Sequence, residues 1–195
     1  TTVEIAQNAV AADGGDNRVS IRGLLNRMGF DHYTGARCHQ FTSALLGSLF
    51  GKLVGNDSEN RQIPELVFEA SQRQKELFLE TLIAGDGDRQ PNSWRYSTAS
   101  ERLRDGVLRL CAHLGLTASY TEDDGTYRIH ATENAKNTLR MDRNSERTTA
   151  DGGVYCVTVE DNHTLLAGRN GTFQFVGQSL YGVLGWDRFR LYDEE

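Results

Sequence analysis

Apolar residues recur at the three- and four-residue spacing of amphipathic helices in four stretches of the chain. Ser100 is expected to cap the last of these helices and Gly115 to end it, because serine favours the N-cap and glycine favours the position after the C-terminus. Pro64 marks a further helix start, since proline is tolerated in a first helical turn. The four predicted helices span residues 19–30, 41–54, 72–85 and 100–115.

Alternating apolar and polar residues predict short strands around the last of these helices. One strand covers Trp94 to Thr98, and two more cover residues 116–120 and 126–130, on either side of the turn sequence EDDG. Residues 1–17, which include AADGGDN, are expected to form a loop. The order helix, strand, helix, strand, strand predicts an α+β fold class.

The C-terminal part of the chain has a different pattern. Residues 133–153 are polar and are predicted to form a linker. After them, the sequence VYCVTVE alternates like a strand, and two more strands are predicted at residues 164–168 and 172–176. These strands are too few to close on themselves, so they are expected to form an incomplete piece of a larger β-structure.

Composition narrows the class of protein. Hydrophobic residues make up 38% of the chain and charged residues 25%, which argues against a membrane protein. No apolar run approaches the roughly 20 residues that a spanning helix needs. No basic-then-apolar leader opens the sequence. We therefore expect a cytoplasmic protein with no membrane partner.

Cysteine usage and net charge exclude fewer classes of protein than the hydrophobic composition does. Cys38, Cys111 and Cys156 are an odd number without CxxC spacing, so neither a disulfide framework nor a zinc site is expected. A net charge of −6 does not by itself suggest a nucleic-acid partner. DNA binding nevertheless depends on where basic residues cluster, not on their total.

The segment LETLIAGDGD, from Leu79 to Asp88, places acidic residues at the end of a predicted helix. The small residues Thr81 and Gly85 would let a second helix approach closely. A carboxylate at Asp86 can hold a hard divalent cation such as Mg²⁺ through its oxygens. Such an ion can activate water and stabilise the leaving oxygen in phosphodiester cleavage. The alternative is an ordinary apolar helix closed by an Asp-Gly turn.

This segment and its surroundings resemble the LAGLIDADG, or DOD-type, homing endonucleases. The resemblance covers residues 45–130 and includes NRQIPELVFEASQRQKELFLE before the motif and WRYSTASERLRDGVLRLCAHLGLTASY after it. It implies a saddle-shaped sheet that grips double-stranded DNA and a Mg²⁺-dependent cut of both strands. Asp86 matches the family's metal-binding catalytic acid, and Gly85 and Gly87 match its small neighbours. Ala84 departs from a position that is often acidic in the family but is not the metal ligand.

The chain shows only one such motif, at residues 79–87, whereas the family pairs two motif helices. The resemblance implies that the second motif comes from intein sequence upstream of Thr1 or from a second copy of the chain. The chain is then a DNA endonuclease only with that partner. Arg95, Arg102 and Arg104 are candidate DNA contacts, although each alone also fits a solvated arginine face.

The tail of the chain resembles the two C-terminal blocks of an intein. VYCVTVEDNH is similar to a block usually written VYDLTVEDNH, and NGTFQFVGQ followed by serine is similar to the block that ends at the splice junction. The resemblance makes Ser179 the hydroxyl nucleophile and Gln178 the residue whose amide cyclises, in place of the usual asparagine. Gly177 replaces the usual histidine, which leaves His163 as the imidazole for proton transfer. By itself, His163 also fits a surface histidine.

Cys156 stands where the block usually has aspartate, and two interpretations compete. It is either a neutral substitute or an internal nucleophile, as in inteins that lack a standard first residue. Those inteins typically carry threonine where this chain has Val176. We therefore favour a supporting role for Cys156.

After the predicted junction, the sequence SLYGVLGWDRFRLYDEE resembles a family B DNA polymerase of archaeal, particularly haloarchaeal, type. SLYG is similar to the NSxYG motif on the helix that contacts the incoming nucleotide, with Tyr181 as its tyrosine. The alternative is a generic aromatic tail. A segment this short cannot polymerise DNA.

The domain organisation predicted from the sequence has four parts. They are an endonuclease region at 1–132, a linker at 133–153, a C-terminal splicing segment of a Hint fold at 154–178, and a host polymerase segment at 179–195. Two alternatives stay open. One is an endonuclease remnant that binds DNA without cutting it, and the other is a plain DNA polymerase fragment.

Overall fold

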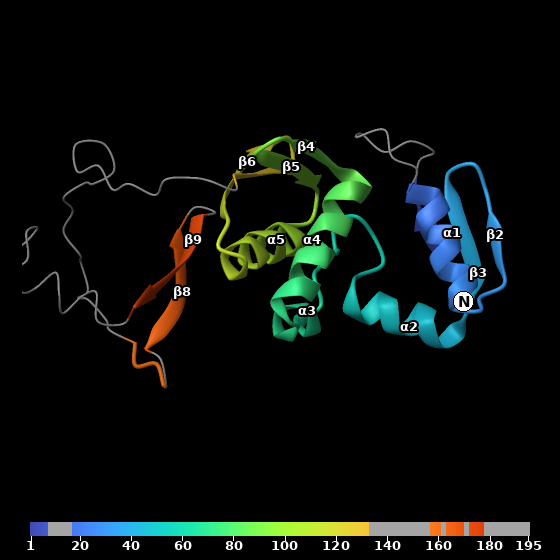
Figure 1. Ribbon diagram of the computed structural model, residues 1–195, viewed down its shortest axis with the longest axis horizontal. Coiled ribbons are helices and arrows are strands. Elements are labelled where there is room, and N and C mark those ends of the chain that lie inside the picture. The colour runs from blue at the N-terminus through green and yellow to red at the C-terminus, as the bar shows by residue number, and fades with distance from the viewer. Residues whose placement is uncertain (8–16, 133–156, 161–162, 170–171, 178–195) are drawn as a thin grey trace, which may run out of the picture. The chain divides into compact units, whose positions relative to one another are not determined.

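A computed structural model describes residues 1–7, 17–132, 157–160, 163–169 and 172–177 (Figure 1). The chain divides into two compact units, Thr1–Asn134 and Ala135–Glu195. Among the helices of the described residues, none has the length and apolar character needed to cross a membrane.

The first unit begins with a three-stranded antiparallel sheet. Its strands are β1 (Thr2–Ala6), β2 (His32–Thr34) and β3 (Cys38–Thr42), in the order β1-β3-β2. The helix α1 (Asn17–Arg27) connects β1 to β2, and the helix α2 (Ala44–Leu53) follows β3. Phe41 of β3 stacks on Phe30 with ring centroids 4.7 Å apart, and Leu25 of α1 is buried. An apolar ring contact therefore joins the segment after α1 to the sheet.

The rest of the unit is a four-stranded antiparallel sheet with its helices. The helices α3 (Glu65–Glu69) and α4 (Gln72–Asp86) come first, followed by β4 (Gly87–Gln90) and β5 (Ser93–Thr98). The helix α5 (Glu101–His113) then leads to the hairpin of β6 (Thr117–Asp123) and β7 (Thr126–Thr132). The strand order is β4-β5-β7-β6, and Figure 1 shows α5 lying along one face of this sheet.

Period-two alternation separates the two faces of this sheet. Trp94, Ile129 and Ala131 are at most 1% exposed and face α5, whose Val107 and Leu110 are fully buried. The residues between them on the same strands point to the opposite side and are exposed. Because successive side chains of a strand alternate, one face of the sheet is core and the other is open and polar.

The two sheets share one topology. In each, a strand is followed by a helix and then by a hairpin, and the last strand lies between the first two (β1-β3-β2 and β5-β7-β6). The second sheet has one strand more, since β4 pairs with the outer edge of β5. In the part of the chain that the structure describes, the outer edge of β1 has no strand beside it.

Several predicted boundaries are confirmed by local interactions. The Ser100 hydroxyl accepts a hydrogen bond from the Leu103 amide at 3.2 Å, which caps α5, and Gly115 has the positive φ of +71° expected after its end. The β6–β7 turn places Asp124 and Gly125 at φ 48° and 70°. This is the conformation that favours Asp-Gly in two-residue hairpins.

Four short strands were not predicted from the sequence. Residues 1–17 were expected to be a loop, yet β1 alternates half-buried Val3 and Ile5 with exposed neighbours and pairs with β3. The helix predicted from residue 41 begins at Ala44, because Ser43 is its N-cap and accepts from the Leu46 amide at 3.2 Å. β2 and β4 have only three and four residues, and such short strands depend on pairing that local sequence does not encode.

The second unit contains one described hairpin. The strands β8 (Thr164–Arg169) and β9 (Thr172–Gly177) pair antiparallel, so both strands predicted here are confirmed. The predicted strand at VYCVTVE is not formed in its described part, because Val157 to Glu160 are not in a strand, and its residues 154–156 lie outside the described residues. So do the linker at 133–153, Cys156, Gln178, Ser179 and Tyr181.

His39 is a fully buried titratable group in the first sheet. Its Nδ1 lies 3.1 Å from the Thr34 hydroxyl, and its Nε2 has no hydrogen-bond partner among the described residues. Burial lowers the pKa of His39, and the positive charges of Arg18, His32 and Arg22 lower it further. The folded protein therefore holds His39 neutral.

The unfolding free energy is predicted to fall as the pH is lowered through about 6.5, where an unfolded histidine takes up a proton that the buried one resists. One such group contributes at most about 1.4 kcal/mol per pH unit. The lowered pKa of His113 acts in the same direction, so His39→Gln should reduce the slope without removing it. Urea titrations followed by circular dichroism at pH 7.5 and 5.5 measure this. An equal slope in wild type and His39→Gln would contradict it.

Candidate functional site

The end of α4 is fixed by a contact that only glycine permits. A Cβ on Gly87 would lie 2.8 Å from the carbonyl oxygen of Ile83 and 2.9 Å from its Cα. The Gly87 amide donates to that same carbonyl, and its φ of −98° and ψ of 171° are extended. The helix therefore passes directly into β4, whereas the sequence predicted a turn at residues 85–87. Asp86 is left as the last helical residue.

Asp86 lies in an electrostatically unfavourable position. Its side chain is exposed, and it stands at the C-terminal end of a helix, the negative pole of the helix dipole. Within the described residues it makes no hydrogen bond or ion pair. Its charge reaches the buried Tyr96, whose pKa is raised to about 12, mainly by burial and then by Asp86. The Asp86 carboxylate at this position therefore does not stabilise the helix.

The donor set at Asp86 fits a partly hydrated metal ion, not a closed metal site. No cluster of three or more histidine, cysteine or acidic side chains with metal-binding geometry is found in the described part of the chain. Mg²⁺ is commonly held by one or two carboxylates, with waters and a substrate phosphate completing its shell. The single exposed carboxylate of Asp86 suits that mode.

One side of α4 has no partner in the described part of the molecule. Leu79 and Ile83 are buried, but Leu77 is 62% exposed, and a Cβ at Gly85 would meet nothing within 4 Å. Thr81 lies between them on the same face and donates its hydroxyl hydrogen to the Leu77 carbonyl at 2.7 Å. At four-residue spacing these three residues share one side of the helix, and the small Thr81 and Gly85 would let a second helix backbone approach closely there.

The open face of the four-stranded sheet continues from this helix end. Across the strands, Asp88 pairs with Arg95, Arg95 with His130, and His130 with Ser119. In the next row, Arg128 lies between Ser97 and Thr121. The side chains of both rows are exposed. They present hydrogen-bonding groups of the kind that contact nucleic-acid phosphates and base edges.

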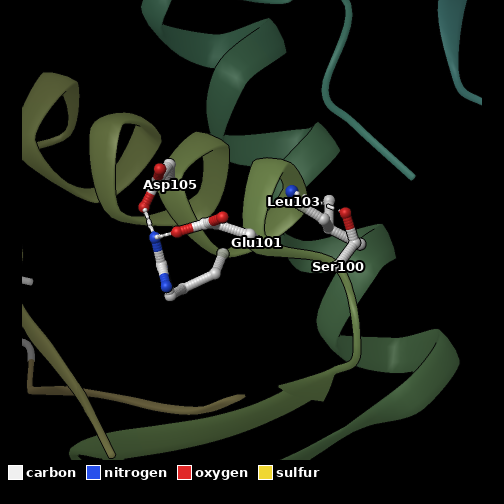
Figure 2. A network of polar contacts seen from close by, with 5 residues as sticks. Ser100, Glu101, Leu103 and Asp105 are labelled. Carbon is white, nitrogen blue, oxygen red and sulfur yellow. Dashed lines mark hydrogen bonds and ion pairs between the residues drawn. The ribbon is translucent and has the colours of Figure 1, made fainter. Parts of the chain in front are cut away.

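Arg104 is not on this face. Its side chain is 8% exposed, and its guanidinium lies 4.6 Å and 4.4 Å from the ring centroids of Tyr120 and Tyr127. Figure 2 shows the carboxylates of Glu101 and Asp105 turned toward the same guanidinium, at 3.0 Å and 2.7 Å. Burial works against the charge, but hydrogen bonds to Asp105 and Glu101 outweigh it and raise the pKa of Arg104. The Arg104 side chain is fully engaged beneath the β6–β7 hairpin.

The three predicted arginines are therefore not brought together. Arg95 projects from the open face of the sheet, whereas Arg102 is exposed on α5, which covers the opposite face. Arg128 and His130 stand on the open face beside Arg95, and sequence reasoning missed both. The strand TYRIHAT carries the pattern that could have identified them, because Arg128 and His130 alternate with residues that point into the core.

His163 is exposed just before β8, with its Nδ1 2.9 Å from the Val159 carbonyl oxygen. Its φ of +52° is unusual for a residue other than glycine. The register pairs Thr164, the next residue, with Gly177 at the end of β9. The histidine backbone thus lies next to the strand end that leads to Gln178.

Comparison with known proteins identifies part of this architecture. Residues 73–145 match the model of a family described as LAGLIDADG-like domain. A DNA polymerase of Thermococcus hydrothermalis is 36% identical over 87 residues, 44% of this chain and 5% of the polymerase. One of Thermococcus aggregans is 24% identical over 225 residues, 83% of this chain and 12% of the polymerase. The chain thus spans a small fraction of these relatives.

A different kind of protein also matches. A DNA gyrase subunit of Mycobacterium gordonae is 30% identical over 100 residues, 48% of this chain and 18% of the gyrase subunit. Among solved structures, the homing endonuclease I-DmoI in complex with DNA and Mn is similar at a TM-score of 0.46 and 17% identity. That match covers 67% of this chain and 73% of the endonuclease chain.

Arg104 is predicted to stabilise the fold. Replacement by methionine removes two cation–π contacts of about 0.5–2 kcal/mol each. We expect Arg104→Met to lower the free energy of unfolding by about 2 kcal/mol, with Arg104→Lys in between because lysine lacks the planar group. The exposed Arg102→Met is the matched control and should change stability by less than about 0.5 kcal/mol. Equal effects at the two positions, in chemical denaturation, would contradict this assignment.

Proposed function

We propose that this chain is part of an intein, in which one half of a homing endonuclease precedes the C-terminal splicing segment. The observation that carries the endonuclease part is the exposed Asp86 at the end of α4, beside a sheet with an open polar face. The match of residues 73–145 to a LAGLIDADG-like domain supports the same assignment.

The range of relatives favours an inserted element over a plain polymerase fragment. Stretches of similar length match DNA polymerases and a gyrase subunit, two enzymes with different chemistry. Each match covers a small part of the relative, 5% of the polymerase and 18% of the gyrase subunit. A module shared in this way by different hosts is the distribution that a mobile insertion produces. The predicted polymerase segment after Gln178 supports a polymerase as the host here.

Duplex DNA is the proposed ligand of the open sheet face. Arg95 and Arg128 supply guanidinium groups that bond phosphate oxygens or the O6 and N7 atoms of guanine. Ser97, Ser119 and Thr121 add hydroxyls that donate and accept. Arg102 and Arg104 are left out of this interface, because the first lies on α5 and the second is buried.

Asp86 is the proposed catalytic carboxylate for strand cleavage. Its position at the helix end and the edge of the sheet brings it close to a backbone phosphate of DNA that lies on the sheet. Asp86 would hold Mg²⁺. When bound, that ion would neutralise negative charge at the phosphate and lower the pKa of a bound water molecule. The negative end of the helix dipole raises the free energy of the ionised Asp86 carboxylate. A bound cation offsets this unfavourable interaction, so the position favours cation binding.

The catalytic unit is proposed to need a second motif helix. The surface of Leu77, Thr81 and Gly85 is the side of α4 that would receive it. The outer edge of β1 would receive the strand that β4 supplies in the second sheet. One segment made of such a helix and a following strand would complete both, whether it is upstream intein sequence or part of a second copy of the chain.

A second activity, peptide release at the intein end, is favoured by the β8–β9 register. In the proposed step, the side-chain amide nitrogen of Gln178 attacks its own backbone carbonyl carbon. A six-membered imide forms, the peptide bond to Ser179 breaks, and the proton passes to the new amino group of Ser179. His163, beside the end of β9, is the proposed proton donor, and Cys156 keeps a supporting role.

Cleavage is predicted to depend on Asp86 and not on Asp88. With upstream sequence or a second copy present, Asp86→Asn should reduce Mg²⁺-dependent cutting of intein-free polymerase gene DNA by at least about 100-fold, since a direct ligand is lost. DNA binding should persist. Asp88→Asn is the matched control and should still cut. Gel assays at increasing protein concentration measure both.

No cutting by wild type at any protein concentration, with binding intact, would instead identify a non-catalytic DNA-binding remnant. Cutting that rises with the square of protein concentration would indicate that a second copy completes the site. Unchanged cutting by Asp86→Asn would refute the role of that carboxylate.

Peptide release is predicted to depend on the Gln178 side chain. After addition of an N-terminal intein piece, mass spectrometry should detect the free segment that begins at Ser179. Gln178→Ala should abolish its release, whereas Gln174→Ala, a matched change within β9, should not. Release from Gln178→Ala at the wild-type rate would rule out cyclisation by this side chain.

A further inference from the structure

The exposed tip of the β6–β7 hairpin holds an arginine in a defined orientation. The Arg128 guanidinium lies 2.9 Å from a carboxylate oxygen of Asp123 on the neighbouring strand. The two side chains are 60% and 62% exposed. Arg128 pairs in register with Thr121, and Asp123 follows two residues later, so both project from the open face. The pair is therefore a diagonal contact on the surface proposed to meet DNA.

The strand ends beneath this pair are held firmly. Asp123 and Thr126 form the last register pair, so the turn has only the two residues Asp124 and Gly125. On the other face, Tyr120 and Tyr127 enclose the buried guanidinium of Arg104. A short turn above and a packed cation below restrict the movement of the strands that carry Arg128.

The chemistry of the pair distinguishes bases from phosphates. A guanidinium has five donors in a planar fork, so contact with one carboxylate leaves donors free for another acceptor. The charge of Asp123 repels a phosphate that approaches the same guanidinium. The neutral O6 and N7 atoms of guanine carry no such penalty and match the spacing of the fork.

We propose that Asp123 is a specificity-determining residue, which directs Arg128 to a guanine edge in the major groove and away from the phosphate backbone. This inference rests on the proposed function of the open face as a DNA interface. Asp123 acts through Arg128 and is a positioning residue. Arg95, which faces Asp88 in register without a hydrogen bond to it among the described residues, lacks this arrangement.

The test is selection of bound sequences from a randomised duplex library, with the full chain and its Asp123→Asn variant. Wild type should enrich a guanine at one position, and Asp123→Asn should lose about tenfold or more of that preference while other positions stay enriched. Arg128→Gln should lose the same position. Replacement of that guanine by 7-deazaguanine should weaken wild-type binding and leave Asp123→Asn unaffected.

Glu122→Gln is the matched control, because it removes the same charge one residue away on the other side of the strand. It should preserve the guanine preference. In salt titrations with a random duplex, Asp123→Asn should bind more tightly than Glu122→Gln, because only the former frees Arg128 for phosphate.

The outcomes separate the two claims. If wild type binds no duplex and enriches no sequence, the proposed DNA interface fails. If wild type enriches a sequence and Asp123→Asn enriches it equally, the interface stands and the role of Asp123 is refuted. Equal loss of preference in Glu122→Gln would also refute it, because net charge would then explain the effect.

Discussion

The close approach of Gly87 to Ile83 is the constraint on which the rest of the site depends. Since no side chain fits there, α4 can end and β4 can begin without an intervening loop. The last helical residue, Asp86, is then held at the edge of the sheet. The same junction sets the register of β4 on β5, and so places Asp88 opposite Arg95 on the open face. One glycine thus links the acidic helix end to the polar sheet surface.

The two faces of that sheet separate residues that stabilise the fold from residues of the proposed DNA interface. The buried face packs on α5 and includes Arg104, a charged residue held by Tyr120 and Tyr127. The open face carries Arg95, Arg128 and hydroxyl groups. Charged residues close together in the sequence therefore lie in different environments, and strand register decides which face each one occupies.

Sequence patterns predicted long, strongly periodic elements better than short ones. The helix capped by Ser100 and the hairpin at the Asp-Gly turn were recognised from local chemistry, because caps and turns need particular residue types. β1 to β4 were missed, since short strands acquire stability from partners distant in sequence. Phe41 illustrates this: its apolar neighbours suggested a helix, but pairing with Val3 makes it part of a strand. Asp86, the proposed catalytic carboxylate, was predicted from its motif, whereas Arg128 and His130 could be placed on the open face only from the register.

The shared topology of the two sheets indicates what the proposed paired site requires. The first sheet lacks, among the described residues, the counterparts of α4 and β4, which are the elements that carry and position Asp86 in the second. Under the proposed function, a partner segment would supply a second acid and a fourth strand together.

The central claim is that DNA lies on the open face of the sheet and not on the helices. A photo-crosslinking residue at position 95 or at position 102 tests this directly, because Arg95 and Arg102 lie on opposite sides of the sheet. We predict crosslinks to duplex DNA from position 95 and none from position 102. Crosslinks from position 102 alone would contradict the account.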